Sequence, residues 1–396
     1  MEIIARERII HKMNSGLNFD TSALLGLRGF LALYILLFHS LLYSDLRVNI
    51  LGQAIVPWFY LLSGFSLALR YTDHEIGSKT FVQRRLYKIL PIYYFSLVLA
   101  FPLIFLGHNY FHPKMNHFTF WSCLLSLLGV QSWVVKYGFG PVGPSWTLST
   151  LWFFYLNYQW IQRRLEKKSN GYLQNTIITC HFTQLVLGTL LYFVPHWTGY
   201  WLATAWPISR IPIFVMGVSC GILCKRMDSD TSDTLSTLLN KNWVLPLKSN
   251  LEAYLLLYVV CILSLFLAKT SEKDLLLARE GIFNTFLQLF FVYMQAMMMI
   301  TLCIGHSRIA NALKCSILQF LGHISYALYL IHEPVLYWIN YMYFGPIEWH
   351  DNYKPGYIRL PAFLIPVHVL LSIGFAAAVT FVERKCKHIV MQYFSF

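Results

Sequence analysis

Long apolar segments alternate with short polar stretches along almost the whole chain. An α-helix needs about 20 mostly apolar residues to cross the hydrocarbon core of a bilayer. Because a span surrounded by lipid must satisfy its backbone hydrogen bonds internally, we expect each segment to be helical. The apolar segments cover residues 24–42, 53–69, 89–106, 119–135, 146–161, 174–194, 206–223, 251–268, 281–304, 317–338 and 360–382. The pattern predicts an all-α, polytopic transmembrane helical bundle.

Basic residues are concentrated in some connections between these segments and are nearly absent from others. The rich stretches are the N-terminal tail, 70–88, 162–173, 224–250, 305–316 and the residues after 383. The stretches 43–52, 107–118, 136–145 and 195–205 hold one Lys or Arg or none. Because the cytosolic loops of membrane proteins are enriched in Lys and Arg, we assign the rich stretches to the cytosol.

This assignment fails if every apolar segment crosses the membrane, and it holds if one segment between residues 89 and 161 does not cross. The segment 119–135 is our candidate, because it is short and is interrupted by Ser122, Ser126 and Ser132. We therefore predict about ten full spans plus one non-crossing apolar segment. The predicted organisation is a cytosolic N-terminal tail over 1–22, a transmembrane domain over 23–383 and a cytosolic C-terminal tail over 384–396.

Composition supports lipid as the main solvent of the protein. Of the 396 residues, 57% are hydrophobic and 12% are charged, which is about half the charged share of a soluble globular domain. The net charge is +13, but the basic residues lie between apolar segments, which indicates contact with membrane lipids rather than with nucleic acid. The eight cysteines and the histidines have no spacing typical of a metal site, and we expect none.

Two ionisable residues, Arg28 and His39, lie within the first apolar segment. Such residues are costly inside a membrane and are functional candidates. Their separation of eleven residues places them on one face of a helix, about 16 Å from each other along its axis. Each also has a purely structural interpretation, Arg28 as a residue whose charge reaches the membrane surface and His39 as a hydrogen-bonded packing residue. Their alignment favours a functional pair.

Arg28, Gly29 and His39 open a series of motifs that resembles the acyltransferase 3 family of membrane O-acyltransferases. The other matching residues are, in chain order, Pro57, Phe59, Ser63, Gly64 and Phe65; Arg84, Arg85, Lys88 and Pro91; Trp146, Leu148, Ser149 and Tyr155; Pro207, Arg210, Phe214 and Gly217; and Gly322, Ser325, Tyr326, Tyr329 and His332. Each motif alone is weak. Their common order and spacing extend from Arg28 to Glu383, which is nearly the whole chain.

The chain departs from the family pattern at three positions. Leu25 stands where the family usually has an acidic residue, three positions before the arginine. Leu151 stands where a glutamate usually follows the Trp-Ser-Leu-Ser block, and Lys88 replaces the usual arginine of the basic cluster. Leu25 and Leu151 favour a different acceptor, or a family member that has lost its activity.

The resemblance implies transfer of an acyl group, which we predict to be acetyl, from cytosolic acyl-CoA as co-substrate. The acceptor is expected to be a hydroxyl of a glycan, lipid or similar molecule on the extracytoplasmic or lumenal side, and no tightly bound cofactor is expected. His39 and Arg28 are the expected catalytic residues, with His39 as general base or transient acyl carrier. Arg28, Arg84, Arg85 and Lys88 are expected to bind the phosphates of CoA. The expected acceptor-binding residues are Ser63, Trp146, Ser149, Arg210, Tyr326 and His332.

Two other functions remain open from the sequence. A transporter or flippase for a polar lipid or glycan would also place charges within the membrane. Transporters often contain inverted repeats and pairs of broken spans, and neither pattern is clear in this chain. A catalytically degenerate family member that serves as a binding protein or scaffold is the second alternative.

Overall fold

The structure is a computed structural model that describes residues 20–46, 48, 50, 52–73, 76–105, 117–138, 140–194, 196–229, 289–304, 308–345 and 360–393. In this part of the chain the long elements are all helical, and the β-structure is one isolated bridge between Ser44 and Leu360. The α-helices are α2 (Ser22–Leu42), α3 (Val56–Tyr71), α4 (Ser78–Phe105), α5 (His117–Leu127), α6 (Trp146–Glu166), α7 (Asn170–Tyr192), α8 (His196–Thr204), α9 (Pro207–Ser229), α13 (Val292–Ile304), α14 (Arg308–Leu313), α15 (Ser316–Phe344) and α16 (Ile365–Tyr393). Short 3-10 helices lie at η1 (Gly52–Ile55), η2 (Gln131–Trp133), η3 (Val135–Tyr137), η4 (Gly143–Ser145) and η5 (Ala362–Leu364).

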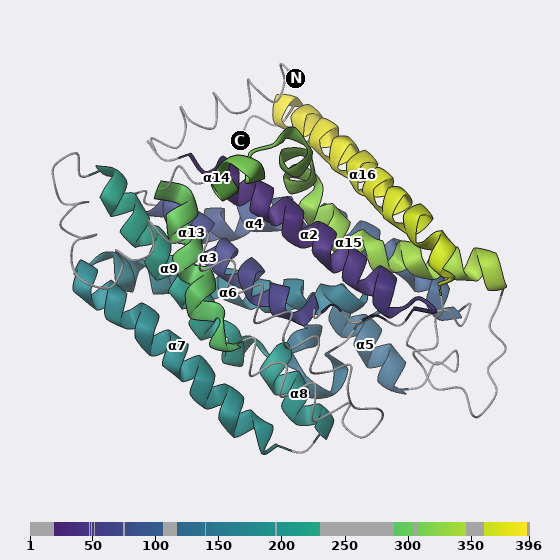
Figure 1. Cartoon of the computed structure of the whole chain (residues 1–396), viewed down its shortest axis with the longest axis horizontal. Coiled ribbons are helices and arrows are strands. Elements are labelled where there is room, and N and C mark those ends of the chain that lie inside the picture. The colour runs from purple at the N-terminus through teal and green to yellow at the C-terminus, as the bar shows by residue number, and fades with distance from the viewer. Residues whose placement is uncertain are drawn as a thin grey trace.

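The helices pack in two groups around two hydrophobic core clusters, and α2 contributes buried residues to both. In the first group α2 lies along α15, α16 covers the outer side of α15, and α4 packs against α15 from another side (Figure 1). In the second group α3 lies along α9, with α7, α6 and α13 packed around α9 (Figure 1). The first apolar segment is therefore paired with a helix from the last quarter of the chain.

Glycines allow both central helix pairs to approach closely. A Cβ atom added to Gly29 of α2 would lie 2.5 Å from the carbonyl oxygen of Leu318 and 2.6 Å from the backbone nitrogen of Gly322, both on α15. A Cβ atom on Gly217 of α9 would lie 2.3 Å from the carbonyl oxygen of Leu61 on α3. Small residues that let backbones meet are typical of helix pairs in membranes, where packing replaces the hydrophobic effect between helices.

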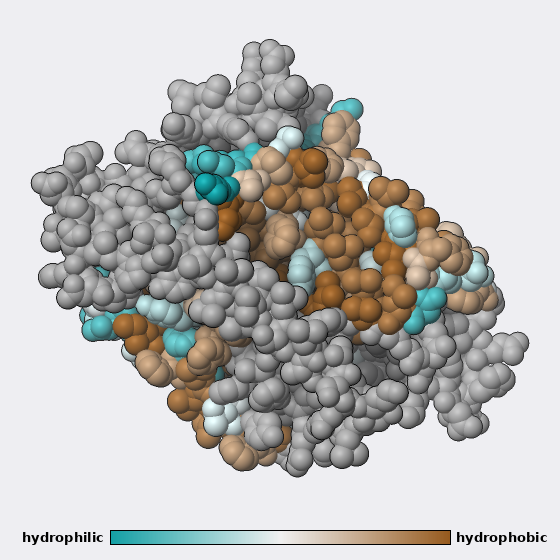
Figure 2. Space-filling model, viewed as in Figure 1, coloured by the Kyte–Doolittle hydropathy of each residue, from teal (hydrophilic) through white to brown (hydrophobic). Residues whose placement is uncertain are grey.

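The outer surface of the bundle is largely apolar. On α16, Leu370 is 70% exposed and Phe381 is 66% exposed, and Figure 2 shows a continuous hydrophobic surface over the region of α2, α15 and α16. By length and composition, four helical stretches of the described residues can cross a membrane: Ser22–Leu42, Ser78–Leu103, Thr198–Arg226 and Ala362–Cys386. The described part of the chain is therefore all-α apart from the single bridge, and its long apolar helices are consistent with a multi-pass membrane protein. The expected number of ten spans stays a prediction, since segment 251–268 and the first part of 281–304 lie outside the described residues.

The segment expected not to cross the membrane forms a short helix and two turns. Helix α5 has 11 residues and is followed by η2 and η3. At 1.5 Å per residue this helix is about 16 Å long, roughly half the thickness of a hydrocarbon core. Its geometry agrees with the expectation from the basic residues.

Some expected boundaries are wrong. Helix α4 begins at Ser78, so Arg84, Arg85 and Lys88 are on a helix and not in a loop, because no residue between positions 78 and 90 breaks the helix and Pro91 is accommodated within it. Helix α16 continues to Tyr393, so the expected start of the C-terminal tail at 384 falls inside a helix. The stretch 195–205, expected as a loop, contains the short helix α8.

Three of the connections that we assigned to the cytosol meet at one end of the bundle. Lys225, at the end of α9, contacts Asp73 at 3.7 Å and donates to the carbonyl of Thr72. The backbone N–H of Asp73 donates to Glu166 at the end of α6 at 2.7 Å, and Arg226 donates to the carbonyl of Glu166 at 2.6 Å. The ends of α3, α6 and α9 therefore lie on the same side, as their shared basic character predicts.

Candidate active site

His39 and His332 are in direct contact between α2 and α15. The Nδ1 atom of His39 lies 2.8 Å from the Nε2 atom of His332, and the two rings stack with centroids 4.9 Å apart. His332 is fully buried, whereas His39 is partly exposed. Tyr43, one turn after His39, stacks with the His39 ring at a centroid distance of 5.7 Å. His39 is therefore the member of the pair that keeps part of its surface exposed.

The hydrogen bonds of His332 determine which nitrogens of the pair carry protons. The Nδ1 atom of His332 lies 3.0 Å from the carbonyl oxygen of Leu328, and a carbonyl only accepts, so Nδ1 must be the protonated nitrogen. Its Nε2 is then an acceptor in the neutral ring, and it receives the Nδ1–H of His39. This assignment leaves the Nε2 atom of His39 as a free lone pair, which is the form that a general base requires.

A third histidine, His368 of α16, bonds to the backbone of His332 and to the side chain of Ser40, which is next to His39. Its Nε2–H donates to the carbonyl oxygen of His332 at 2.8 Å, and its Nδ1 lies 2.8 Å from the hydroxyl of Ser40. Ser40 directly follows His39, so the two bonds tie α2, α15 and α16 together at the level of the histidine pair. His368 is buried and was not singled out from the sequence.

Arg28 lies in the first half of α2, closer than His39 to the end of the bundle where this helix begins. Its guanidinium is within electrostatic range of Tyr155 on α6. The hydroxyl of Tyr155 lies 3.0 Å from the hydroxyl of Ser63 on α3. Tyr326, one of the expected acceptor-binding residues, donates instead to the carbonyl of Ile89 at 2.9 Å. A polar group between α2, α3 and α6 thus lies closer to the start of α2 than the histidine pair does. It consists of Arg28, Ser63 and Tyr155.

The expected phosphate-binding residues of α4 are not equivalent. Arg85 is partly buried, donates to the hydroxyl of Tyr71 at 2.9 Å and lies over the rings of Tyr71 and Phe81 at 5.5 Å. Arg84 and Lys88 are exposed. The aromatic contacts therefore give Arg85 a structural role in addition to any role in binding.

Ser149 and Trp146 lie at the start of α6 and are buried. The hydroxyl of Ser149 accepts hydrogen bonds from the backbone and the hydroxyl of Ser132, at 3.1 and 2.8 Å. The carbonyl of Ser149 also accepts from the indole of Trp133 at 3.0 Å. Ser149 therefore fastens the turns after α5 onto α6, which is a structural role that the sequence alone did not indicate.

Arg210 is fully buried at the start of α9. Its Nε–H donates to the carbonyl of Thr204 at 3.0 Å, while its Nη1 group has no hydrogen-bond partner among the described residues. Tyr60 lies within electrostatic range of both Arg210 and Tyr329, and the ring of Tyr329 meets that of His332 edge-on at 6.2 Å. Tyr60 and Tyr329 therefore lie between Arg210 and the histidine pair.

Glu333 is a buried carboxylic acid that directly follows His332. The hydroxyl of Tyr337 donates to its Oε1 atom at 2.8 Å, and a Cβ added to Gly143 of η4 would lie 2.2 Å from its Oε2 atom. This contact presses the loop before α6 against α15. An acidic residue within an apolar segment is a signal that the sequence contains, although Glu333 was not among the expected site residues.

Comparison with known proteins identifies the group to which the chain belongs. A sequence profile described as an acyltransferase domain, that of the acyltransferase 3 family, matches residues 22–382. The chain belongs to the acyltransferase 3 family. The match covers all of the described helices except the last turns of α16, and it includes every residue of the two polar groups above.

One curated relative is acyltransferase MdmB of Streptomyces mycarofaciens, which is 33% identical over 160 residues. That alignment covers 37% of this chain and 40% of the length of the relative. No solved structure matches the chain.

The two leucines that depart from the acyltransferase 3 pattern have packing roles. Leu25 contacts α15 at Gly322, where an added Cβ would lie 2.8 Å from the Cγ of Leu25. Leu151 is partly buried and packs against the hydrophobic core. Each therefore contributes apolar packing at a position where the family usually has a carboxylate.

Proposed function

We propose that this acyltransferase 3 protein transfers an acyl group from a cytosolic CoA thioester to a hydroxyl on the opposite side of the membrane. The observation that carries the proposal is the His39–His332 pair, in which the hydrogen bond to Leu328 leaves the Nε2 lone pair of His39 free. An alcohol is a weak nucleophile until a base takes its proton, and a neutral, oriented imidazole is suited to that task.

The reaction balances without a further reactant. The Nε2 of His39 takes the proton of the acceptor hydroxyl while the hydroxyl oxygen attacks the carbonyl carbon of the thioester. The C–O bond forms, the C–S bond breaks, and the imidazolium returns the proton to the leaving CoA thiolate. His332 accepts the Nδ1–H of His39 throughout, so it orients the ring and stabilises its positive charge, as an acceptor behind a catalytic histidine does in other enzymes.

The same geometry also suits a covalent route, in which the Nε2 atom of His39 takes the acyl group before the acceptor arrives. Rapid quenching with labelled acyl-CoA and no acceptor separates the two routes. The covalent route leaves label on a tryptic peptide that contains His39, whereas direct transfer leaves none.

The placement of the two ends of the reaction follows from charge. The phosphates of CoA remain near the cytosolic surface because burying several charges in hydrocarbon is very costly. Arg28 lies on the His39 face of α2, about 16 Å closer to the cytosolic end along the helix axis. A thin pantetheine arm, on the order of 15–20 Å long by extended-chain reach, spans that distance. The donor thus reaches His39 without crossing the membrane.

The proposal is tested with purified protein in lipid nanodiscs, labelled acetyl-CoA, and glycan and lipid extracts as acceptors. We expect transfer by the wild type and a loss of about 10²–10⁴-fold with His39→Ala, the range in which general bases contribute. His181→Ala is the matched control, since His181 lies on α7 beside Tyr293. A protein that moves a lipid or glycan without consuming acyl-CoA would instead be a transporter or flippase.

A further inference from the structure

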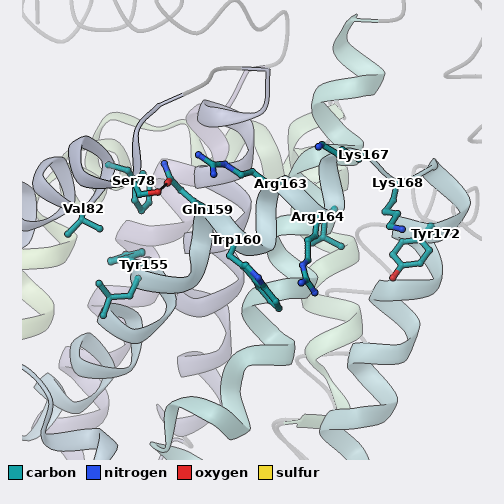
Figure 3. A pocket seen from close by; sticks show the side chains of 13 residues that line it. Ser78, Val82, Tyr155, Gln159, Trp160, Arg163, Arg164, Lys167, Lys168 and Tyr172 are labelled. Carbon is teal, nitrogen blue, oxygen red and sulfur yellow. Dashed lines mark hydrogen bonds between the residues drawn. The ribbon is translucent and has the colours of Figure 1, made fainter.

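An open pocket lies at the end of the bundle where α6 ends and α7 begins. Its volume is about 710 Å³, within the range of small-molecule sites. Its walls are one face of α4, the second half of α6 and the first turn of α7 (Figure 3). None of the expected site residues lines it. Of its lining only Tyr155 belongs to the motifs described above, and its basic residues were assigned to the cytosolic stretch 162–173.

Four cations line this pocket without a carboxylate beside them in its wall. They are Arg163, Arg164, Lys167 and Lys168 (Figure 3), and all four are exposed. Glu166, the acid within this run, is turned away, since its oxygens accept from the backbone of Asp73 and the side chain of Gln162 at 2.7 and 2.8 Å. Among the described residues no carboxylate of the lining balances this positive charge, and the pocket therefore suits a ligand with several phosphate groups.

Aromatic rings lie among these cations. Trp160 is 60% exposed and Tyr172 is 49% exposed. Figure 3 shows Arg164 beside the indole of Trp160 and Lys168 beside the ring of Tyr172. The guanidinium carbon lies 4.0 Å from the centroid of the indole, and the amine of Lys168 lies 5.1 Å from that of Tyr172. Arg163 and Lys167 have no recorded partner among the described residues and are free to meet an anion. Aromatic and cationic groups on one wall are what a purine base with phosphates requires.

The pocket shares one residue, Tyr155, with the polar group around Arg28. Tyr155 lines the pocket and is the residue that bonds Ser63 and faces Arg28. From Tyr155 to Arg164 the helix rises about 14 Å. The part of CoA from its 3′-phosphate to its diphosphate is on the order of 10 Å long by bond counting. The pocket can thus hold that part, with the diphosphate next to Arg28 and the arm directed towards His39.

We propose that this α4–α6–α7 pocket binds the 3′-phosphoadenosine diphosphate end of the donor. Arg163 and Lys167 bind the 3′-phosphate, Trp160 stacks on the base, and the diphosphate lies at Tyr155 and Arg28. The inference rests on the proposed use of a CoA thioester, and it moves the principal phosphate contacts from Arg84 and Lys88 on α4 to the end of α6. The same phosphate chemistry could come from an anionic lipid headgroup, which the test separates.

The test compares two donors and one ligand fragment. Adenosine 3′,5′-bisphosphate is titrated into nanodiscs of phosphatidylcholine, and transfer is measured with acetyl-CoA and with S-acetylpantetheine, which lacks the nucleotide. For the double variant Arg163→Ala/Lys167→Ala we expect fragment affinity to fall more than about tenfold per lost cation. The KM for acetyl-CoA should rise in parallel, with kcat nearly unchanged, and turnover of S-acetylpantetheine should not change.

The control is Lys79→Ala/Arg308→Ala, which removes the same charge from two exposed positions outside the pocket. It should bind the fragment as the wild type does. Equal fragment binding by the pocket variant would overturn the inference, as would fragment binding that is lost when phosphatidylglycerol is added, which would identify a lipid site. If the wild type neither binds CoA nor transfers from S-acetylpantetheine, the proposed function itself is wrong.

Discussion

His39 and His332 are 293 positions apart in the sequence and share one hydrogen bond. At the scale of single residues this bond decides what His39 can do, because it fixes the proton on Nδ1 and frees Nε2. The two residues form one unit, and substitutions of both should not add. The sequence indicated each histidine separately, His39 by its alignment with Arg28 and His332 by a motif. It contained no information on their contact, which depends on the packing of α2 on α15.

The effect of replacing His332 on catalysis should therefore depend on whether the new side chain can still accept the hydrogen bond from His39. His332→Leu removes the acceptor for the Nδ1–H of His39, and we expect kcat to fall about 10²-fold. His332→Gln keeps an amide oxygen near the same place, and its loss should be about tenfold. The measurement is kcat at saturating donor, with thermal unfolding as a check of folding.

The double substitution His39→Leu/His332→Leu should be no slower than His39→Leu alone. A double variant that is slower by the product of the two single effects would mean that His332 acts independently, for example on the acceptor. Such a result would support the acceptor-binding role expected from the sequence.

A second single-residue prediction concerns pH at the start of α2. Asp20 contacts Lys314 at 2.8 Å. Partial burial raises the pKa of the Asp20 carboxyl, but hydrogen bonds from Lys314 and Ser22 and the charge of Lys314 outweigh it and hold the pKa at about 2, below the ordinary 3.8. The stabilisation is then fully present above pH 3.8 and is lost as the pH falls through 2. Since Asp20 is 59% exposed, solvent limits it to less than about 1 kcal/mol.

Asp20→Asn isolates this charge, because an amide oxygen can still accept from the backbone N–H of Ser22 as the carboxylate does at 2.9 Å. The free energy of unfolding in detergent should be slightly lower for the variant at pH 5, and the difference should shrink towards pH 2. A difference that grows as the pH falls would contradict the direction of the pKa shift.

At the scale of helices, close backbone contact positions the site. His39 is on the same helix as Gly29, whose Cα faces the backbone of α15 at Leu318 and Gly322. A side chain at position 29 must push α2 and α15 apart, and this moves the two histidines that they carry. The glycine motifs could be found in the sequence, but the sequence did not indicate which helices they join.

Gly29→Val should consequently reduce both stability and activity. Overpacking costs typically about 1–3 kcal/mol, and we expect a lower unfolding temperature together with a reduced kcat. The matched control is Gly374→Val on α16, where a Cβ meets no atom within 4 Å, so its effect should stay within about 0.5 kcal/mol. Normal kcat in a destabilised Gly29→Val would show that the histidine pair tolerates movement of these helices.

The ends of the helices are less well predicted by the apolar segments than their central parts are. The apolar runs 24–42, 146–161 and 206–223 coincide with most of α2, α6 and α9. The basic residues of α4 were expected in a loop, because a helix that leaves an apolar environment becomes polar without ending, and hydropathy does not show where such a helix begins. The second half of α6 carries polar residues for another reason, because Gln159 donates to the carbonyl of Ile76 before α4 and Gln162 donates to the carbonyl of Tyr71 at the end of α3.

At the scale of the whole molecule, the distribution of basic residues predicted which ends of helices lie together. The contacts among Asp73, Glu166, Lys225 and Arg226 place three such ends side by side. The pocket at this end depends on the relative placement of α4, α6 and α7, which no local pattern determines. The direction of the chain through the membrane is therefore the property that most needs a direct measurement.

Cysteine labelling of intact cells can measure that direction at three positions. The background carries Cys315→Ser and Cys386→Ser, since both cysteines are exposed. Single cysteines are then placed at Lys79, Lys136 and Gly171, which are exposed and lie before α5, after α5 and after α6. An impermeant maleimide reports which of them face the outside.

We expect label at Lys136→Cys in intact cells, and at Lys79→Cys and Gly171→Cys only after permeabilisation. The reason is that α4 crosses, α5 is too short to cross at about 16 Å, and α6, with 21 residues, is about 31 Å long and crosses despite its glutamines. Lys79 and Lys136 on the same side would mean that the segment 119–135 crosses. Lys136 and Gly171 on the same side would mean that α6 does not. Either result would reverse one half of the bundle and move the basic pocket away from cytosolic CoA, so this experiment also tests the premise on which the path of the donor depends.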